Sequence, residues 1–322
     1  MQLVPSFDQT LAVLRAVAES TRLRLVFLCS HGELTVTELT EALGIEQPQV
    51  SRHLKILCDA GVLERFREGA WVFYSLGQGG GSSLARNLLN FVPSDDASLV
   101  LDRRRMARIR REREQNAAKY FRENAGRWDE LRRLYVAEAE VENGLRKLFS
   151  SRRMRYFLDV GTGTGRMLEV FAPLCECAVG IDISLEMLAV ARVNLARAGI
   201  ENCRVRRGDM YNLPQASESV DAVIFHQVLH YSDDPAMAIM EAARVLAPGG
   251  IIAVADFASH QLEHLRSEHA HRRLGFRDRD VLAWFSDAGL DATESLRLGG
   301  NPLTVVIWAA EKKAVTSGED NK

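Results

Sequence analysis

The chain has 322 residues, enough for two domains of ordinary size. It carries 41 basic and 43 acidic side chains, so its formal net charge of −2 identifies no class of partner. No run of about 18 uncharged apolar residues occurs, which argues against a membrane-spanning helix. The N-terminal residues lack the pattern of a signal peptide, and five cysteines at irregular spacing do not form a disulfide framework. We therefore expect a cytoplasmic protein with reduced thiols and no membrane partner.

Residues 1–90 show helical periodicity followed by a hairpin pattern. Apolar residues recur at helical spacing from Phe7 to Glu19, and Ser20 is expected to cap a second helix. In chain order, the next predicted elements are helices over TVTELTEAL and EQPQVSRHLKILCDAG and a β-hairpin over VLERFREGAWVFYSL. Helices followed by a hairpin in this order predict a winged helix-turn-helix.

This stretch resembles the ArsR family of winged-helix repressors. The resemblance implies a homodimer with two-fold symmetry that binds operator DNA through the helix QPQVSRHLKIL. Side chains in the first turns of that helix are expected to reach base edges, whereas basic residues around it are expected to contact phosphates. Any single arginine among them could equally be an ordinary solvated residue. The expected base contacts are Gln47, Gln49, Ser51, Arg52 and His53, and the expected phosphate contacts are Lys55, Arg22, Arg24, Arg65 and Arg67.

Metal-sensing members of that family often carry a Cys-x-Cys pair in the helix before the recognition helix. Thr35 and Thr37 stand there in this chain, and a threonine hydroxyl is a poor replacement for a thiolate ligand. We therefore expect no metal at this place, and the regulatory signal must enter elsewhere.

The middle of the chain is expected to connect two domains. GQGGGSS predicts a flexible break, and residues 91–150 predict a helical linker that could also take part in dimerisation. From residue 151 to 312 strands and helices alternate, which predicts a doubly wound, mostly parallel α/β sheet, and residues 313–322 are expected to be a disordered tail. The predicted strands cover 156–160, 178–182, 203–207, 220–225, 251–256, 291–297 and 303–310.

LDVGTGTGRM carries the pattern of a nucleotide-binding loop. Gly161, Gly163 and Gly165 follow a strand and open a helix, so the backbone can approach a ligand closely. Asp159 suits a ligand with a cationic amino group, and Asp182, after the second strand, suits ribose hydroxyls. Asp209, after the third strand, could accept from an adenine amino group.

Together these residues resemble the class I S-adenosylmethionine-dependent methyltransferases, above all the group that acts on quinones and other small molecules. The resemblance implies a Rossmann-like seven-stranded sheet whose last strand is antiparallel, with S-adenosylmethionine or S-adenosylhomocysteine as cofactor. A dinucleotide-binding domain is the alternative, but its glycines are spaced differently. The implied contacts are Asp159, Gly161, Gly163 and Gly165 for the methionine end, Asp182 for the ribose, and Asp209 with Met210 for the adenine; Ile183, Met187 and His226 complete the predicted set.

Polar and aromatic residues after the fourth and fifth strands predict the wall of a second ligand. His226, His230 and Tyr231 are the catalytic candidates, because a histidine there can act as a general base near neutral pH. Hydrogen-bonded loop histidines are the alternative. Gln227, Asp256 and Phe257 are expected beside them.

Two further groups invite a metal hypothesis that we do not adopt. His260, His264 and His271 would share a helix face and could hold zinc, but histidines near arginines are more often surface or ion-pair features. Cys175 and Cys177 are similar to thiol sites of arsenite-methylating enzymes, yet their place before a strand favours a buried structural role.

Over residues 7–312 the whole chain resembles ArsR-type regulators with a C-terminal methyltransferase-like domain, some of them similar to methionine-cycle regulators that respond to S-adenosylhomocysteine. The first hypothesis is therefore a dimeric regulator that senses an adenosyl ligand. The second is an active methyltransferase for a quinone-like or metalloid acceptor, and the third is a metal-sensing repressor.

Overall fold

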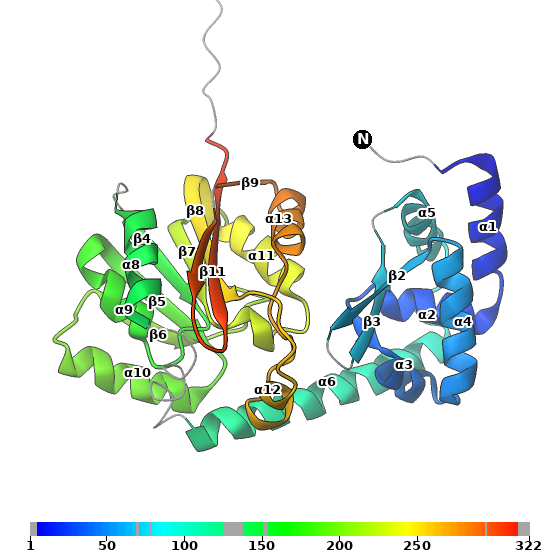
Figure 1. Ribbon diagram of the computed structural model, residues 1–322, viewed down its shortest axis with the longest axis horizontal. Coiled ribbons are helices and arrows are strands. Elements are labelled where there is room, and N and C mark those ends of the chain that lie inside the picture. The colour runs from blue at the N-terminus through cyan, green and yellow to red at the C-terminus, as the bar shows by residue number, and fades with distance from the viewer. Residues whose placement is uncertain are drawn as a thin grey trace, which may run out of the picture. The chain divides into compact units, whose positions relative to one another are not determined.

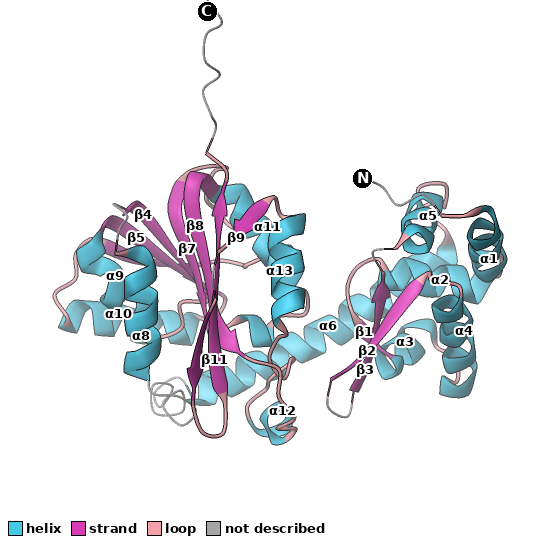
Figure 2. Cartoon of the chain, turned by 45° about the horizontal axis from the view of Figure 1, so that its top comes forward, coloured by secondary structure: helices cyan, strands magenta, loops and turns pink. Residues whose placement is uncertain are grey.

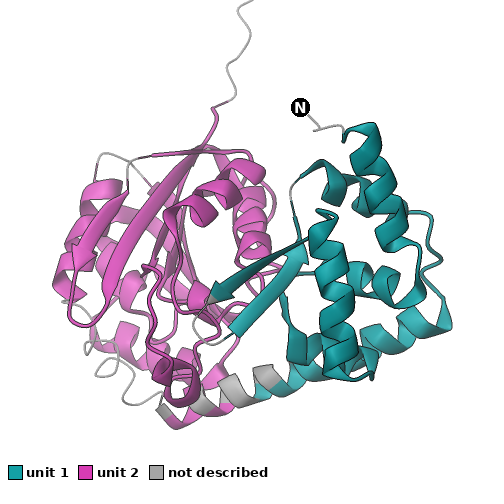
Figure 3. Ribbon diagram, turned by 45° about the vertical axis from the view of Figure 1, so that its right-hand side comes forward, with its two compact units in different colours: residues 1–116 teal, residues 117–322 magenta. Residues whose placement is uncertain are grey.

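The computed structural model describes residues 5–68, 71–77, 79–124, 138–150, 154–293 and 295–314. The chain divides into two compact units, residues 1–116 and residues 117–322 (Figure 3). Within the described part of the chain, no helix combines the length and the apolar character needed to span a bilayer. The predicted tail lies outside the described residues from position 315 on, as do residues 125–137 of the predicted linker.

The first unit consists of helices around a small antiparallel sheet. β2 and β3 form the predicted hairpin, and β1 pairs with β3, so the strand order is β1-β3-β2. Buried aliphatic side chains from every helix of this unit meet in one core. The elements in chain order are α1 (Phe7–Val17), α2 (Ser20–Cys29), β1 (Leu34–Thr35), α3 (Val36–Leu43), α4 (Gln47–Asp59), β2 (Leu63–Glu68), β3 (Trp71–Leu76) and α5 (Gly80–Leu89) (Figure 1).

Side-chain caps fix the start of two of these helices. Glu19, not Ser20, is the N-cap of α2, and its carboxylate accepts from the backbone N–H groups of Thr21 and Arg22 at 2.9 Å each. The sequence prediction was one residue late because Ser20 is the more usual cap type. At α3, Thr35 and Glu38 form a reciprocal capping box. Thr35 therefore sets the start of α3.

The glycine-rich run is not a flexible break. Gly80 to Ser83 form the first turn of α5, which packs against the end of α4. The Ser82 hydroxyl donates to the carbonyl of Val62 at 2.8 Å, and a Cβ on Gly81 would lie 2.7 Å from the Gly61 carbonyl oxygen. Gly81 is needed because two backbones approach each other closely there, which composition alone does not show.

Helix α6 (Ala97–Asn124) begins in the first unit and ends in the second. Met106 and Ile109 join the core of the first unit. Asp102 is fully buried and binds the guanidinium of Arg24 on α2 through two hydrogen bonds of 2.7 and 2.6 Å. The predicted linker region is therefore in part an integral helix of the first unit.

The second unit is a doubly wound α/β sheet, as predicted. Its strand order is β10-β11-β8-β7-β4-β5-β6, and β9 pairs with β11. The neighbours from β8 to β6 are parallel, whereas β11 is antiparallel to β8, as the resemblance implies. The single strand predicted over 291–297 is instead two short strands beside β11. The strands are β4 (Met154–Val160), β5 (Cys175–Asp182), β6 (Cys203–Arg207), β7 (Val220–His226), β8 (Leu246–Phe257), β9 (Leu290–Ala292), β10 (Leu296–Gly299) and β11 (Thr304–Lys312).

Helices cover both faces of this sheet, with one apolar core on each side (Figure 2). On one face lie α8 (Glu138–Phe149), α9 (Arg166–Phe171) and α10 (Leu185–Arg197). On the other face lie α11 (Pro235–Val245) and α13 (Asp278–Asp287). Because strand side chains alternate between the faces, near-continuous apolar strands such as β7 fill both cores. The carboxyl ends of β4, β5, β6, β7 and β8 then share one edge, where ligands bind in such folds.

Candidate functional sites

The glycine loop after β4 is held by backbone contacts to β5. The Gly161 N–H donates to the Ile181 carbonyl at 2.7 Å, and the Gly163 N–H donates to Asp182 Oδ2 at 2.8 Å. Gly161, Gly163 and Gly165 have φ values of 72°, 51° and 84°, a region that disfavours other residues. The loop therefore has the conformation that its sequence predicts.

Two polar side-chain pairs flank this loop. Asp159 is buried and accepts from the Thr162 hydroxyl at 2.6 Å. Arg166, the first residue of α9, binds the carboxylate of Glu142 on α8 through hydrogen bonds of 2.7 and 2.9 Å, and these contacts raise the pKa of the guanidinium. The second pair ties α8 to the helix that the glycine loop opens.

Asp182 lies at the end of β5 and organises the loop that follows. Besides Gly163, it accepts from the Ser184 N–H at 2.8 Å. Burial raises the pKa of its carboxyl, and the two N–H groups act in the opposite direction. Each carboxylate oxygen still has a lone pair for a hydroxyl donor. Beside it Ile183 is 57% exposed, whereas Met187 is buried on α10.

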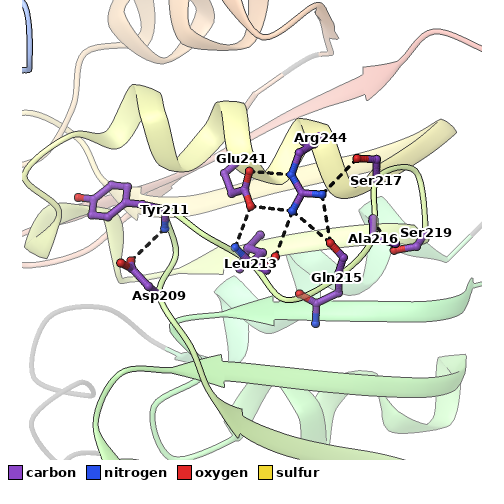
Figure 4. Close-up of polar contacts among 9 residues, drawn as sticks. All are labelled: Asp209, Tyr211, Leu213, Gln215, Ala216, Ser217, Ser219, Glu241 and Arg244. Carbon is purple, nitrogen blue, oxygen red and sulfur yellow. Dashed lines mark hydrogen bonds and ion pairs between the residues drawn. The ribbon is translucent and has the colours of Figure 1, made fainter.

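Asp209 lies on the loop after β6, and a neighbouring arginine fixes the path of that loop (Figure 4). Asp209 is exposed and accepts from the Tyr211 N–H at 3.0 Å, and Met210 packs on the sheet core. Arg244 on α11 donates to the carbonyls of Leu213 and Gln215 at 3.0 and 3.1 Å and is held by Glu241 at 2.7 Å. The loop is thus anchored to α11, a role that the sequence did not suggest.

The predicted acid residues therefore lie at or just after the ends of three neighbouring strands, in the order β4, β5, β6. The register pairs Asp159 with Gly180 and Asp182 with Arg207, and the Gly208 N–H donates to the Asp182 carbonyl at 3.0 Å. All three carboxylates lie at the same edge of the sheet, as expected for parallel strands that end together.

His230 and Asp256 form a buried pair at the ends of β7 and β8. His230 Nδ1 lies 2.7 Å from Asp256 Oδ1, and the His230 N–H lies 3.2 Å from Asp256 Oδ2. Their side chains are 2% and 1% exposed. Since an ionised carboxylate only accepts, Nδ1 donates in this contact when Asp256 is ionised, and in the neutral ring the lone pair is then on Nε2. His226 is also buried, and Gln227 after it has φ 50° and donates to the Ala255 carbonyl.

Aromatic rings surround His230. The ring centroids of Tyr231, His271 and Phe257 lie 4.1, 4.2 and 5.1 Å from that of His230. Phe121, near the end of α6, meets Tyr231 edge to face at 4.8 Å. Phe121 is a functional candidate that the sequence analysis missed, and His271 was considered there only as a metal ligand, because both lie far from the strand ends in sequence.

The histidines between residues 260 and 271 do not share one helix face. α12 covers only His264–Glu268, so the predicted helical alignment of His260 and His271 with His264 is wrong. Desolvation lowers the pKa of His260 to about 4, and it also lowers the pKa of His271. Among the described residues no group of three His, Cys, Asp or Glu side chains could hold a metal ion.

The two cysteines of β5 differ in exposure. Cys177 is exposed, so the predicted buried role is wrong for it, whereas Cys175 is partly buried. Burial raises the pKa of Cys175 to about 11 and that of buried Cys203 to about 12, and thiols held in this form are poor metal ligands.

In the first unit, α4 presents a polar face. Val50, Leu54 and Leu57 are buried, which turns the other side of the helix outward. His53 is an exception, since it is half-buried with Nδ1 3.6 Å from Glu19 Oε2. The predicted DNA contacts that are exposed are Gln47, Gln49, Ser51, Arg52, Lys55, Arg65 and Arg67.

Arg22 and Arg24 were predicted to contact phosphates, but both are engaged inside the unit. Arg24 is bound to Asp102, and Arg22 donates through Nε to the Ala16 carbonyl. Their guanidinium groups therefore support the fold, and phosphate contacts by either of them stay a prediction.

Comparison with known proteins matches the two units separately. A model described as bacterial regulatory protein, arsR family, matches residues 19–65, and a methyltransferase-domain model matches residues 158–254. The arsenic resistance transcriptional regulator ArsR1 of Pseudomonas putida is 48% identical over 65 residues, which are 20% of this chain and 51% of that protein. The methyltransferase YcgJ of Bacillus subtilis, itself uncharacterized, is 31% identical over 120 residues, which are 37% of this chain and 47% of that protein.

An arsenite methyltransferase of Halobacterium salinarum is 35% identical over 104 residues, covering 31% of this chain and 26% of that protein. The chain thus spans about half the length, or less, of these relatives.

Proposed function

This chain joins an arsR-family winged helix-turn-helix domain to a methyltransferase domain, and we propose that it is a transcriptional regulator whose affinity for operator DNA depends on S-adenosylmethionine or S-adenosylhomocysteine. The observation that carries the proposal is the contact between Gly163 and Asp182, which holds the glycine loop and the carboxylate in one arrangement. A chain that also exposes the polar face of α4 has both a ligand site and a DNA-reading helix.

The residues at the sheet edge fit an adenosyl amino acid. Asp182 retains an acceptor lone pair on each oxygen, so both ribose hydroxyls can donate to it. Asp159 supplies negative charge for an amino group beside the glycine loop, and exposed Asp209 can accept from an adenine amino group. Such a ligand supplies an activated methyl group when it is S-adenosylmethionine.

Helix α6 is the element that we propose carries the signal. In the second unit, Phe121 contacts Tyr231 and Arg122 Nε lies 3.7 Å from the carboxylate of Glu186, which is four residues beyond Asp182. In the first unit, Arg105 donates to the Leu43 carbonyl at 3.1 Å, just before α4. A ligand changes DNA affinity only if it binds two states of the protein unequally, and these contacts could differ between the two states.

Operator binding with and without ligand tests the proposal. Duplex DNA selected by the protein from a random pool is labelled, and its affinity is measured by fluorescence anisotropy while either adenosyl ligand is titrated in. A tenfold change needs about 1.4 kcal/mol of coupling. Asp182→Ala should remove the ligand effect while leaving DNA binding intact, whereas Gln49→Ala should weaken DNA binding at every ligand concentration. Identical DNA affinity with and without both ligands contradicts the proposal.

We also propose that the chain acts as a homodimer through α1 and α5. These helices pack against each other, and Phe7 and Leu14 on α1 and Phe91 after α5 are 78%, 40% and 84% exposed. Such apolar exposure is typical of a surface that a partner covers. Sedimentation should give a dimer for the wild type and a monomer for Phe7→Asp with Phe91→Asp. The control Leu282→Asp, at a 39% exposed position of the second unit, should remain dimeric.

A second candidate function is methyl transfer to a small quinone-like or metalloid acceptor. The hydrogen bond between His230 and Asp256 favours the quinone-like acceptor, because this arrangement fixes the tautomer that a general base requires. Relatives named arsenite methyltransferase also match this part of the chain. Labelled methyl transfer from S-adenosylmethionine, abolished by Asp182→Ala, would support this function.

A further inference from the structure

We propose that His230 and Asp256 remove a proton from a hydroxyl group of the methyl acceptor, so that the acceptor is a phenol or an enol. This inference rests on the second candidate function, methyl transfer. It assigns a role to the buried pair and a chemical class to the acceptor.

The hydrogen bonds between His230 and Asp256 determine which nitrogen of the imidazole is basic. Asp256 is bound by the His230 N–H, by His230 Nδ1 at 2.7 Å and by the Phe257 N–H at 2.8 Å. These three donors hold the carboxylate in place, and the carboxylate holds the imidazole with its proton on Nδ1. Nε2 is therefore the basic nitrogen, and among the described residues it makes no hydrogen bond.

His230 differs from the neighbouring imidazoles in its hydrogen-bond partner. The Leu262 N–H donates to His260 Nδ1, and His271 Nδ1 is buried without a partner among the described residues. Of these three histidines, His230 is the one with a hydrogen-bonded carboxylate in the described part of the chain. The ionisable residues around it include Asp256, Tyr231, His260 and His271, and farther out Arg266. Buried Arg272 and Arg273 also adjoin it, since their backbone N–H groups donate to the His230 carbonyl at 2.9 Å each. A proton gained on Nε2 of His230 is thus stabilised by a directly hydrogen-bonded carboxylate, a contact that neither His260 nor His271 makes in the described part of the chain.

Whether methyl transfer needs a base depends on the attacking atom of the acceptor. A neutral amine or a trivalent arsenic atom attacks with a lone pair that it already has, and neither needs a base. A hydroxyl becomes a strong nucleophile only when its proton is removed. As the acceptor oxygen forms its bond to the methyl carbon, the bond between that carbon and sulfur breaks and its electron pair stays on sulfur. The hydroxyl proton moves to His230 Nε2, giving a methyl ether, S-adenosylhomocysteine and an imidazolium bound to Asp256.

The surroundings select a planar acceptor. Tyr231, Phe257 and His271 present ring faces and edges within 4.1 to 5.1 Å of the His230 ring centroid, measured between centroids. Aromatic neighbours favour a flat ring held by stacking or edge contacts. His230 is 2% exposed and Tyr231 beside it is half-buried, so binding of an acceptor at Nε2 requires side chains around His230 to rearrange.

The test uses the full-length protein, labelled S-adenosylmethionine and two probes, phenol and the more acidic 4-nitrophenol. Asp256→Asn should lower kcat for phenol by about 100-fold or more, because an asparagine NH₂ donates to Nδ1 and moves the proton to Nε2. The loss should be much smaller for 4-nitrophenol, which is already largely ionised in weakly alkaline buffer. Nitrogen NMR of the His230 ring should show the proton on Nδ1 in the wild type and on Nε2 in the variant, without any cofactor.

Controls separate a base from a structural residue. His230→Gln serves if Asp256→Asn does not fold, and it should show the same difference between the probes. His264→Gln, at an exposed position of α12, should keep wild-type rates. Absence of transfer to both phenols by the wild type, or an equal loss for both probes, overturns the inference. If S-adenosylhomocysteine still binds and still alters operator affinity in that preparation, the proposed regulatory function stands while this inference fails.

Discussion

The guanidinium of Arg24 and the carboxylate of Asp102 form two parallel hydrogen bonds, of 2.7 and 2.6 Å, between α2 and α6. Asp102 is fully buried, whereas the Arg24 side chain is 22% exposed. Arg24→Ala should therefore destabilise the first unit by about 3–5 kcal/mol, because it leaves a buried carboxylate without a counter-charge. Asp102→Ala should cost less, about 1–3 kcal/mol, since the exposed edge of the arginine can be hydrated.

Urea unfolding of the two variants measures this difference. The double variant Arg24→Met with Asp102→Leu should recover most of the loss, because neither charge then remains buried. A larger loss of unfolding free energy for Asp102→Ala than for Arg24→Ala would show that the difference in exposure between the two side chains does not determine which variant is less stable.

Glu19 should make the stability of the first unit depend on pH. Burial acts to raise its pKa, but the Thr21 and Arg22 N–H groups outweigh this and lower the pKa from 4.5 to about 2. A lowered folded-state pKa gives stability that is present above pH 4.5 and is lost as the pH falls toward 2. Glu19→Ala should thus cost about 1 kcal/mol at pH 7 and almost nothing near pH 2.

Glu46 provides the matched control for this cap. It is the N-cap of α4 but makes no side-chain capping hydrogen bond, so Glu46→Ala should change the unfolding free energy little at either pH. Equal losses for the two variants in thermal or urea unfolding would contradict the role given to the Glu19 carboxylate.

Gly161 should tolerate no side chain. At its φ of 72° an added Cβ would overlap Val228 Cγ2, which packs against the sheet core. Gly161→Ala should therefore abolish binding of S-adenosylhomocysteine in calorimetry and lower the melting temperature. Gly199→Ala is the control, because its φ is 65° but no atom lies within 4 Å of the added Cβ. It should cost about 1–2 kcal/mol of stability and leave ligand affinity unchanged.

Arg244 should influence ligand binding without touching the ligand. Its hydrogen bonds to Leu213 and Gln215 hold the loop that carries Asp209 (Figure 4). Arg244→Ala should weaken S-adenosylhomocysteine binding by about tenfold, or about 1.4 kcal/mol, since the loop must then be ordered on binding. Arg192→Ala, at an exposed position of α10, should bind as the wild type does. Unchanged affinity in the Arg244 variant would show that the loop needs no anchor.

Elements with a strong local signal could be predicted from the sequence. The glycine loop after β4 and the acid residues at or just after the ends of β4, β5 and β6 are set by short-range rules, and parallel pairing then brings them to one edge. Helix α4 was likewise predictable, because Val50, Leu54 and Leu57 mark its buried face.

The remaining features depend on contacts between segments distant in sequence. The glycine-rich composition around Gly81 predicted a linker, but the Gly61 carbonyl lies where a side chain at position 81 would be. Arg24 reads as a phosphate contact, but its partner Asp102 is 78 residues away. His271 was predicted to share a helix face with two other histidines, but its ring packs against that of His230. Local rules contain no information on such partners.

The hydroxyl of Ser82, at the start of α5, lies within hydrogen-bond distance of the carbonyls of Gly61 and Val62, which follow α4, the helix that we propose reads DNA. If two copies meet through α5, the subunit interface and the end of that helix are separated by a single side chain. Assembly and sequence readout would then vary together, and a substitution that shifts the spacing between subunits would also shift which half-site separation the protein prefers.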